Sequence, residues 1–578
     1  MNDLYKILEN LMGYANTQEA VEFIYVIKAW EKLSNEKKID NELVFESFYN
    51  QKVDTKKLDS IFEKLSKTIK LFKIYRFDSK MFNDEDNLTY VLGLVKNAVQ
   101  LPEVNEAFYN QKGMYDFSVS NQIAELGIKL LDGDSKELYV PFTNGFAYSY
   151  YTDKKIYADF QMPLAELVAE LINILEDKNI EFNLTNALEN PTFINPDAPH
   201  ILKQFESVLS FPPFGMRDKL DTSKDKFHRF QFQRGTVLDI AHFEHILAQT
   251  KLKAVVLMPV GFTYRGSIEE EFRKYLIEQN YLEAIIQLAP NLHSATSIET
   301  TFFVINKQKM DDKVLFINLK DERFITRNGR KLVLKSLDDI LDIYNNKKEI
   351  ENISSIVANA DIASSNYSFA IDRYVIPSNI KNLEKNFKLF EKVKLEEIAD
   401  VRRSQLFKDE GEGEEVYEIS PSDFSKSGFT LDCGKIKQIG SQYKRLQTYK
   451  LEPYDVLLST KGTIGKVAII GETNDVMIAS QAIQVIRLHD KDKKEKAVAL
   501  YMFLKSEISQ TILSLFVSGS AMPQVATSII KNLPIPLLSQ DQQKKLEENF
   551  NKEVMLYKNI EELNNKIKSI HTNFLGDK

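Results

Sequence analysis

The sequence predicts a multidomain α/β protein with four parts, and three changes of pattern along its 578 residues support this. Residues 1–112 repeat apolar positions at three- and four-residue spacing, whereas residues 113–385 alternate short apolar runs with amphipathic helices. Residues 386–540 are rich in β-branched and aromatic residues interrupted by glycines. A chain of this length is expected to form roughly three or four domains. The boundaries that we predict are 1–112, 113–385, 386–540 and 541–578.

The two ends of the chain are predicted to be helical. Residues 1–112 form a small helical domain, because Leu58, Ile61, Phe62 and Leu65 fall on one helical face and no strand-like alternation occurs. Residues 541–578 form one long helix with an apolar stripe along it. The spacing favours pairing of this stripe with another helix over packing on its own domain. Its members are Leu546, Phe550, Val554, Tyr557, Ile560, Leu563, Ile567 and Ile570.

Residues 113–385 are predicted to form a mostly parallel, Rossmann-like sheet with helices on both faces. Amphipathic helices are expected at 164–175 and 268–279. The apolar runs that indicate strands are 137–140, 208–209, 254–259, 284–288, 301–305 and 314–317. Ligands of such folds bind beyond the carboxyl ends of the strands, which is where residues 211–214 would lie.

Composition narrows the class of protein. A hydrophobic content of 43% with 27% charged residues is typical of a soluble globular protein, and no apolar run reaches membrane-spanning length. The start does not resemble a signal peptide, and the single cysteine, Cys433, excludes an internal disulfide, so we expect a cytoplasmic protein. The formal net charge of -8 argues against a protein that coats nucleic acid everywhere, but it is compatible with a local basic groove.

No metal site is predicted. His242 and His245 have the spacing of two ligands on one helical turn, but no third ligand is near them in the sequence. We therefore interpret them as part of an ordinary surface helix.

The segment Phe211-Pro212-Pro213-Phe214 is the most informative motif. Enzymes that methylate an exocyclic base nitrogen carry Asn, Asp or Ser, then Pro-Pro and an aromatic residue, at this place. The aromatic ring stacks on the extruded base, and a side-chain oxygen accepts hydrogens from the amino group. Phe211 has no acceptor, and Ser210 should point to the opposite side of an extended segment. Phe211 and Phe214 either stack on a base or pack in the core, and packing is favoured.

Residues 113–385 resemble the modification subunit of type I restriction systems, an adenine N6-methyltransferase. Beyond the Pro-Pro motif, the similarity extends over residues 254–261, 288–293, 297–307 and 366–375. The C-terminal part resembles the specificity subunit of the same systems, which reads DNA. Here the similarity covers residues 455–466, 480–483, 519–524 and 533–537, and amounts to one target-recognition domain followed by one spacer helix.

The resemblance implies S-adenosylmethionine as cofactor, bound on an Asp-Pro-x-x-Gly-x-Gly loop, with no metal. The equivalent loop runs from Val140 to Phe146, so Val140 replaces the acid and Asn144 and Phe146 replace the glycines. Asp159 is expected at the ribose hydroxyls, and Asn186 replaces the acid that meets the adenine amino group. We therefore predict a degenerate cofactor site. Its residues are Pro141, Asn144, Gly145, Asp159 and Asn186.

Basic residues with interleaved tyrosines predict a DNA-binding surface between residues 402 and 466. Such cations position a protein on phosphates, whereas base choice needs side chains that reach a groove edge. The candidates for base choice are Arg402, Arg403, Gln405, Ser441 and Gln442. The alternative is a set of solvated loop charges. The predicted DNA-binding residues are Arg402, Arg403, Lys435, Lys437, Tyr443, Lys444, Arg445, Lys461 and Lys466.

Three functions follow from these patterns. The first is a sequence-specific binder of double-stranded DNA on a methyltransferase scaffold that has lost catalysis, in a restriction-modification-like or phage-defence system. The second is an active, divergent adenine N6-methyltransferase, and a nuclease is disfavoured because residues 1–112 show no nuclease motif. A single recognition domain predicts a homodimer through the C-terminal helix, or assembly with restriction or defence subunits. No membrane partner is expected.

Overall fold

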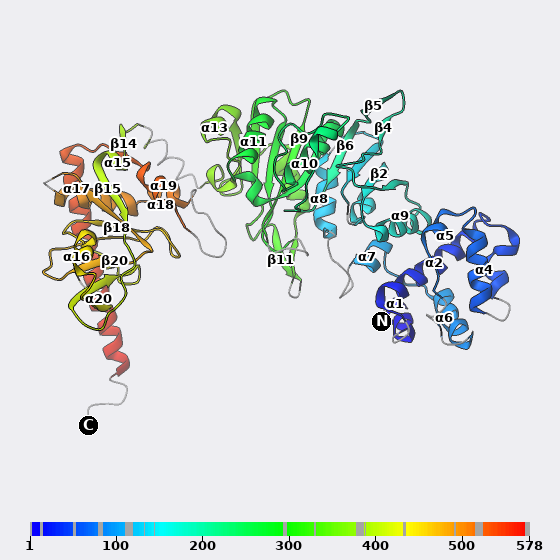
Figure 1. Cartoon of the computed structure of the whole chain (residues 1–578), viewed down its shortest axis with the longest axis horizontal. Helices are drawn as coiled ribbons and strands as arrows, with labels where there is room; N and C mark the ends of the chain where they lie inside the picture. The colour runs from blue at the N-terminus through cyan, green and yellow to red at the C-terminus, as the bar shows by residue number, and fades with distance from the viewer. Residues whose placement is uncertain are drawn as a thin grey trace. The chain divides into compact units, whose positions relative to one another are not determined.

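The computed structural model describes residues 3–11, 15–49, 54–78, 82, 85–109, 119–131, 133–143, 145–292, 298–328, 331–376, 387, 389–431, 435–490, 493–514 and 524–572 (Figure 1). The chain divides into two compact units, Met1–Val375 and Ile376–Lys578. Each unit has its own hydrophobic core, and each is described by itself.

The first unit begins with short helices around a buried α2 (Thr17–Asn35). This helix starts with a capping box in which Asn16 accepts from the backbone of Glu19 and the Glu19 carboxylate accepts from the backbone of Asn16. Trp30 is fully buried against three phenylalanine rings. The other described helices are α1 (Asp3–Leu11), α3 (Phe45–Tyr49), α4 (Thr55–Leu65), α5 (Lys70–Ile74), α6 (Glu85–Asn97) and α7 (Val104–Tyr109), with a 3-10 turn η1 (Asn41–Leu43).

A mixed sheet forms the centre of the first unit. Within the described residues its strand order is β3-β2-β1-β6-β7-β9-β8-β10-β13. Strand β9 runs antiparallel to β7 and β8, β13 runs antiparallel to β10, and the other neighbours are parallel. The strands are β1 (Glu137–Pro141), β2 (Lys155–Phe160), β3 (Ile180–Leu184), β6 (Phe205–Ser210), β7 (Thr250–Pro259), β8 (Leu282–Gln287), β9 (Thr300–Asn306), β10 (Lys313–Asn318) and β13 (Ser354–Ala358).

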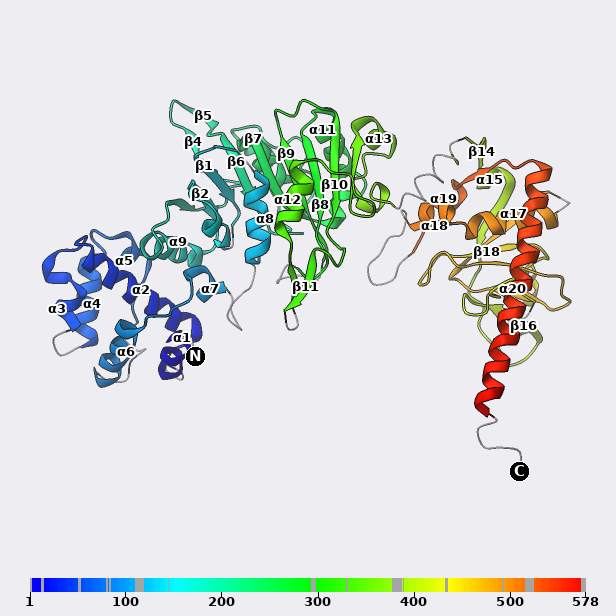
Figure 2. The same cartoon turned by 180° about the vertical axis from the view of Figure 1, so that it is seen from behind.

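Helices cover both faces of this sheet, as Figures 1 and 2 show from opposite sides. On one face α8 (Asn121–Leu131) packs on β6, β7 and α12 (Leu337–Asn345), while α9 (Pro163–Leu175) packs on α2 and joins the N-terminal helices to the sheet. On the other face lie α10 (Asp239–Gln249) and α11 (Ile268–Glu278). Adjacent residues of a strand point to opposite faces of the sheet, so the first unit has a hydrophobic core on each face. In β1, Leu138 and Val140 pack in the core that contains α8 and α9, and Tyr139 packs in the core that contains α10 and α11.

Shorter elements complete this unit. They are η3 (Ala147–Tyr151), the hairpin β4 (Ile194–Asn195) and β5 (Ala198–Leu202), η4 (Thr222–Lys224), η5 (Val260–Thr263), the hairpin β11 (Ile325–Asn328) and β12 (Lys331–Leu334), α13 (Asn359–Ser364) and η6 (Ile371–Arg373). The expected sheet covered on both faces is therefore confirmed.

The second unit is α+β. Its described sheets have the orders β15-β21-β18-β19, β17-β16-β20 and β14-β22. The strands are β14 (Lys392–Lys394), β15 (Ala399–Arg403), β16 (Glu414–Ile419), β17 (Ile436–Ile439), β18 (Val456–Ser459), β19 (Val467–Ile469), β20 (Met477–Ala479), β21 (Ile483–Leu488) and β22 (Pro534–Pro536). The helices are α15 (Leu395–Ile398), α16 (Tyr443–Leu446), α17 (Lys493–Lys505), α18 (Glu507–Ser514) and α19 (Thr527–Lys531), with η7 (Gln447–Tyr449).

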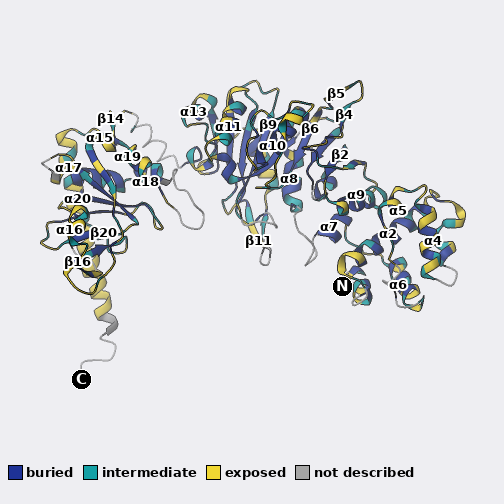
Figure 3. Cartoon of the chain, viewed as in Figure 1, coloured by how far each residue is buried: buried dark blue, intermediate teal, exposed yellow. Residues whose placement is uncertain are grey.

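The unit ends in the long helix α20 (Gln540–Thr572), as predicted. Its first half packs on its own domain, because Phe550 is buried against Phe429 and Tyr501. Its second half is exposed along the predicted stripe, as Figure 3 shows. The exposed stripe consists of Tyr557, Ile560, Leu563 and Ile567, while Ile570 lies outside the described side chains. The predicted stripe is therefore packed on its own domain in the first half of α20 and exposed in the described part of the second half.

Two negative findings apply to the described residues. None of their helices is both long and apolar enough to cross a membrane. No group of three or more His, Cys, Asp or Glu side chains among them has the arrangement of a metal site.

Candidate functional site

The predicted motif lies at the place where ligands of this fold class bind. We call the carboxyl ends of β1, β2, β6 and β7, with the loops that follow them, the carboxyl edge. Strand β6 ends at Ser210, and residues 211–214 follow it directly. Ser210 is fully buried, and its hydroxyl donates to the carbonyl of Pro141 at 3.0 Å. Ser210 therefore serves the link between β6 and β1 and does not replace the missing acceptor.

Phe211 and Phe214 are half-buried and pack against the core beneath α8. The ring of Phe211 meets Phe302 edge-on, with centroids 6.4 Å apart. A methyl group added to Gly127 of α8 would lie 3.5 Å from Phe211 and only 2.9 Å from Leu209, so this helix approaches the strand closely. Pro212 is buried and Pro213 is half-buried. The packing interpretation of the two phenylalanines fits these contacts.

The loop after β1 is filled by aromatic side chains. Phe142 adopts a left-handed backbone conformation with φ of 61°, and its ring lies 4.6 Å from His242, centroid to centroid. Phe146 is fully buried against Phe160, and its backbone N–H donates to Asn105 at 2.7 Å. Pro141 is buried and Gly145 half-buried, while Asn144 lies outside the described residues. The described residues of this loop, apart from the half-buried Gly145, are therefore buried in the protein.

Asp159 is buried and has protein partners on both oxygens. Tyr139 donates to one oxygen at 2.9 Å, and Thr192 donates to the other at 2.7 Å. Burial raises the pKa of Asp159 to about 6, although these hydrogen bonds favour its ionised form. Its exposed fraction is 1%, so a ribose contact would require these partners to move.

Tyr139 also takes part in hydrogen bonds within the core that contains α10. Its hydroxyl lies 2.9 Å from Nε2 of His245, and Nδ1 of His245 lies 2.6 Å from Arg229. Because the tyrosine donates to Asp159, the network assigns the histidine proton to Nε2. Arg229 also donates to the carbonyls of Ala187 and Leu188 and pairs with Asp225. We call Asp159, Tyr139, His245, Arg229 and Asp225 the buried network.

The interpretation of His242 and His245 as residues of a surface helix is wrong. Both are buried, at 1% and 0% exposure, because α10 is covered by the sheet and by residues 228–233. Burial lowers the pKa of His242 to about 3 and that of His245 well below its ordinary value. Within the described residues Nδ1 of His242 has no hydrogen-bond partner.

The residues around Asn186 are closely packed. Asn186 is half-buried and accepts from the backbone of Leu188 at 3.1 Å. The cavity that it lines with Gln161 and Met216 has a volume of about 10 Å³, which is room for about one water molecule. A larger cavity of about 740 Å³, lined by Leu188, Thr192 and Phe230 among others, adjoins it. The described side chains at the expected cofactor positions are thus mostly bonded to other protein groups or packed in the core.

Two acidic residues at the carboxyl edge, Asp239 and Glu269, were not predicted from the sequence. Asp239, the first residue of α10, accepts from the backbone of Gly215 at 2.8 Å, directly after Phe214. Its second oxygen is buried and, among the described residues, unpartnered, as is one oxygen of Glu269. Burial raises the pKa of both carboxyls, and the nearby Arg265 opposes the shift. In the sequence nothing sets these two acids apart from other Asp and Glu residues. They stand out only in the folded structure, where Asp239 contacts Gly215 directly after the Pro-Pro motif and Glu269 lies near Asp239.

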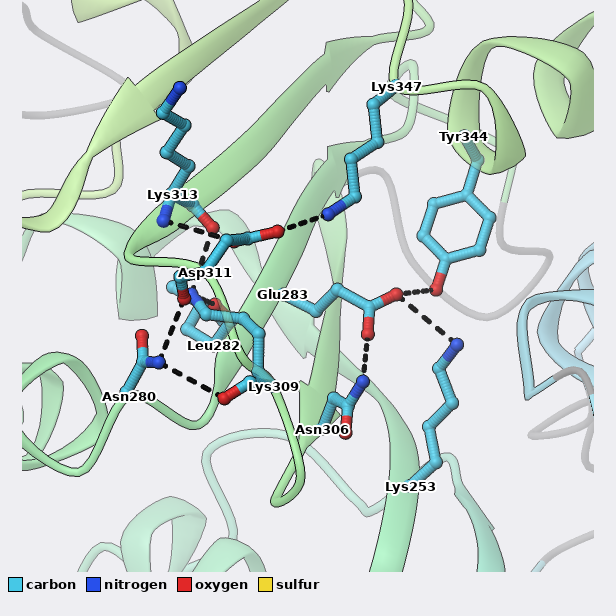
Figure 4. Close-up of polar contacts among 10 residues, drawn as sticks. All are labelled: Lys253, Asn280, Leu282, Glu283, Asn306, Lys309, Asp311, Lys313, Tyr344 and Lys347. Atoms are coloured by element: carbon cyan, nitrogen blue, oxygen red, sulfur yellow. Dashed lines mark hydrogen bonds and ion pairs between the residues drawn. The ribbon is translucent and has the colours of Figure 1, made fainter.

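A second polar cluster lies away from this edge, where β8 and β10 begin (Figure 4). Glu283 pairs with Lys253 at 3.2 Å and accepts from Asn306 at 2.6 Å and from Tyr344. Lys309 donates to the carbonyls of Leu282 and Lys313, and burial lowers its pKa to about 8. These groups are already paired with one another, so the cluster joins strand ends and offers no open ligand site.

In the second unit the predicted DNA-binding residues fall into two groups. Lys435 and Lys437 both pair with Glu418 at 2.7 Å. Lys437 is 5% exposed, so the prediction that it contacts phosphate is not supported by its position. The other cations form no ion pair with any described residue. These are Arg402, Arg403, Lys444, Arg445, Lys461 and Lys466.

Four of these unpaired cations come from two neighbouring segments. Arg402 and Arg403 end β15, and Arg402 donates to the carbonyl of Thr448 at 3.3 Å. Lys444 and Arg445 lie on α16, immediately before η7. We call Arg402, Arg403, Lys444 and Arg445 the basic patch. Tyr443 and Tyr449 lie beneath it and pack on a local core with Phe407.

Lys461 and Lys466 flank the turn between β18 and β19. Gly462 and Gly465 both have positive φ there, a backbone conformation that glycine adopts readily, so these glycines serve the turn between the two strands. Lys466 is exposed and Lys461 half-buried.

Comparisons with known families divide the chain as the two units do. Residues 152–383 match the family described as N-6 DNA Methylase, and residues 388–569 match the type I restriction modification DNA specificity domain. The methylase subunit of the type I restriction enzyme MpnII of Mycoplasma pneumoniae is 33% identical over 181 residues, which are 30% of this chain and 33% of that protein. The MjaVII methylase subunit of Methanocaldococcus jannaschii is 24% identical over 264 residues, 42% and 44% of the two chains. The matched stretches span less than half of these relatives.

Among solved structures, the methyltransferase subunit of a type I restriction-modification system from Streptococcus thermophilus has the same fold. The TM-score is 0.54 with 15% identity, and the match covers 64% of this chain and 98% of that chain. At this identity the likeness establishes the architecture alone.

Proposed function

Because this chain joins an N-6 DNA methylase domain to a type I DNA specificity domain, we propose that it is a sequence-specific DNA-binding protein that has lost base methylation. It would serve a restriction-modification or phage-defence system in the cytoplasm, with double-stranded DNA as its ligand. The observation that carries the proposal is a contrast between the two units. The carboxyl edge is filled by protein side chains, whereas the mostly exposed basic patch has no carboxylate partner among the described residues.

Three local features support the proposed loss of methylation. Phe211 offers no acceptor, Asp159 is bonded to Tyr139 and Thr192, and Phe146 is part of the core. Removing one oriented hydrogen-bond partner from a preorganised site typically costs about two to three orders of magnitude in rate. Asp159 and Phe146 add to this loss, because both are buried at positions where the cofactor would bind.

Two measurements on the full chain test this proposal. Calorimetry with S-adenosylmethionine should show no binding, and labelled cofactor should transfer no methyl group to duplex DNA. Selection from a random duplex library should enrich a defined sequence. Methyl transfer at ordinary enzyme rates, or binding to all duplexes alike, contradicts the proposal.

The second candidate is an active, divergent methyltransferase, and Asp239 is the observation in its favour. Its unpartnered oxygen lies beside the Pro-Pro motif and is an acceptor of the type that Phe211 lacks. Phe211→Asn and Asp239→Ala separate the two candidates, because alanine, unlike asparagine, has no side-chain oxygen that could accept a hydrogen bond. In an active enzyme Asp239→Ala abolishes transfer and Phe211→Asn changes it little, whereas in the inactive protein neither variant changes a rate of zero.

We further propose that two copies pair through the exposed stripe of α20, so that the dimer reads two identical half-sites. The half-exposed or exposed side chains Tyr557, Ile560, Leu563 and Ile567 support this, since they repeat at helical spacing beyond the part of α20 that is packed. Light scattering should give twice the mass of the chain. Ile560→Glu with Leu563→Glu should give a monomer, and Glu561→Lys on the exposed helix is the matched control.

A further inference from the structure

Gln405 and Arg445 form a side-chain contact on the outer surface of the second unit. The guanidinium of Arg445, through Nη2, donates to Oε1 of Gln405. Arg445 is exposed and Gln405 half-exposed, and Leu406 beside them is 59% exposed. Arg445 forms no ion pair with a described carboxylate. The contact therefore orients an exposed arginine without neutralising its charge.

Buried neighbours fix the two segments that carry this pair. Phe407 follows the glutamine by two residues, Leu446 follows the arginine by one, and both belong to the same small core with Val416 and Ile439. Phe407 is 1% exposed and Leu446 is fully buried. Because each anchor is adjacent or nearly adjacent to the polar side chain, the pair stands on a rigid base.

Glu410 holds the loop that leads into α16. Its carboxylate accepts from the backbone of Gly440 at 3.1 Å, the backbone of Ser441 at 2.7 Å, the hydroxyl of Ser441 at 2.7 Å and the amide of Gln442 at 3.4 Å. These hydrogen bonds lower the pKa of Glu410. The loop approaches so closely that a side chain on Gly413 would collide with the backbone of Gly440 at 2.5 Å. Glu410 is thus a positioning residue for Arg445.

The contact also determines which polar groups remain available. Oε1 of Gln405 already accepts from Arg445 and keeps one further lone pair. The other groups that the pair presents are the amide N–H groups of the glutamine and the remaining guanidinium N–H groups of Arg445, so most of the available groups are donors. In the major groove the base edge that offers two adjacent acceptors is guanine, through N7 and O6, and arginine matches it with two parallel hydrogen bonds.

We propose that Arg445, buttressed by Gln405 and positioned through Glu410, reads a guanine in the major groove of the target duplex. This inference rests on the proposed DNA-binding function and adds to it one base and the residues that select it. The remaining members of the basic patch contact phosphates and contribute affinity without base choice.

The test is selection of bound sequences from a random duplex library by the full-length protein, followed by affinity measurements on the selected site and its single-base variants. Wild type should require guanine at one position. Arg445→Ala should lower discrimination for that guanine by roughly 5- to 150-fold, as expected for loss of a bidentate contact. Arg445→Lys should lower it similarly while retaining most of the non-specific affinity, because the charge remains but the planar fork does not.

Gln405→Ala and Glu410→Gln should weaken the guanine preference partly, and Lys444→Ala should weaken all sequences equally. Unchanged far-ultraviolet circular dichroism and melting temperature establish that each variant is folded. If wild type selects a sequence and Arg445→Ala retains the full preference at every position, the assignment of Arg445 is overturned while DNA binding stands. If wild type selects no sequence, the proposed function fails and the assignment fails with it.

Discussion

Polar side chains differ in burial and pairing between the carboxyl edge of the first unit and the basic patch of the second unit. At the edge, Asp159, His245 and Arg229 are buried and bonded to one another. On the patch, Arg403, Lys444 and Arg445 are exposed and form no ion pair with a carboxylate in the part of the chain that the structure describes. Polar groups that are already satisfied inside a protein have little to gain from a ligand, whereas unpaired surface cations gain from phosphate. The comparison supports the proposal that the second unit binds DNA.

The largest expected effect comes from removing the basic patch. Arg402, Arg403, Lys444 and Arg445 changed together to alanine should weaken DNA binding by roughly a thousandfold or more at about 0.1 M salt, because each lost phosphate contact removes released counterions. The slope of log affinity against log salt should become shallower by about three to four. Binding titrations at several salt concentrations measure both.

Lys435→Ala is the matched control, because this lysine is exposed but paired with Glu418. It should leave the salt slope nearly unchanged. If the fourfold variant keeps the wild-type slope, the patch is not the DNA surface.

The next effect tests whether Phe146 belongs to the core. Phe146→Ala should lower the free energy of unfolding by about 3–5 kcal/mol, since it removes a fully buried aromatic ring. Phe211→Ala at the half-buried position should cost clearly less. Denaturant titrations of both variants provide the measurement. A small loss for Phe146→Ala would mean that its space opens readily, which would favour cofactor entry.

Asp159 should give the first unit a distinctive dependence on pH. Its folded pKa is about 6 and its ordinary value is 3.8. Below about pH 4 both states are protonated, so the group has no effect there. As the pH rises to about 7 the unfolded chain loses this proton more readily than the folded chain, and stability falls by about 3 kcal/mol.

Asp159→Asn should remove this fall in stability. Between pH 4 and pH 7 the free energy of unfolding of the variant should therefore rise relative to that of wild type. Urea titrations at the two pH values measure it. Asp221→Asn is the control with opposite sign, because a hydrogen bond from Ser223 lowers the pKa of that exposed carboxyl. Parallel profiles for wild type and Asp159→Asn would mean that Asp159 is solvated in the folded protein.

The smallest effect concerns the unpartnered histidine. His242→Leu should stabilise the first unit by about 1 kcal/mol at pH 7, because it replaces a buried nitrogen without a partner. The gain should increase toward pH 5, where the unfolded wild type takes up a proton that the buried ring, with a pKa of about 3, does not. His245→Leu should destabilise instead, since it removes a partner of Tyr139 and Arg229. Melting curves that rank the two variants the other way would contradict the assigned network.

Sequence reasoning located the fold and the motif because both depend on local patterns. Val208 and Leu209 are apolar and the prolines after Ser210 end the strand, so the place of residues 211–214 beyond β6 was predictable. The burial of His245 was not, because its partners Tyr139 and Arg229 are distant in sequence and meet only across the folded sheet. The pairing of Lys437 with Glu418 was missed for the same reason.

The sequence predicted that the cofactor and catalytic positions are altered, but it did not predict which side chains meet there. The substitutions at Val140, Phe146 and Phe211 indicated a changed pocket. No pattern along the chain indicated Asp239, whose relation to Gly215 arises where a helix begins beside a strand end. Prediction from one sequence works where neighbours in the chain are neighbours in space, and it fails where side chains meet from separate elements.

Arg229 makes separate segments of the first unit depend on one another. Its guanidinium holds the carbonyls of Ala187 and Leu188, His245 and Asp225 together. Removing one member of a buried ion pair typically costs about 3–5 kcal/mol, because the remaining charge stays buried without its partner. The loss of this one side chain would therefore leave Asp225 and two carbonyls unsatisfied at the same time, and the segments that carry them would be destabilised together.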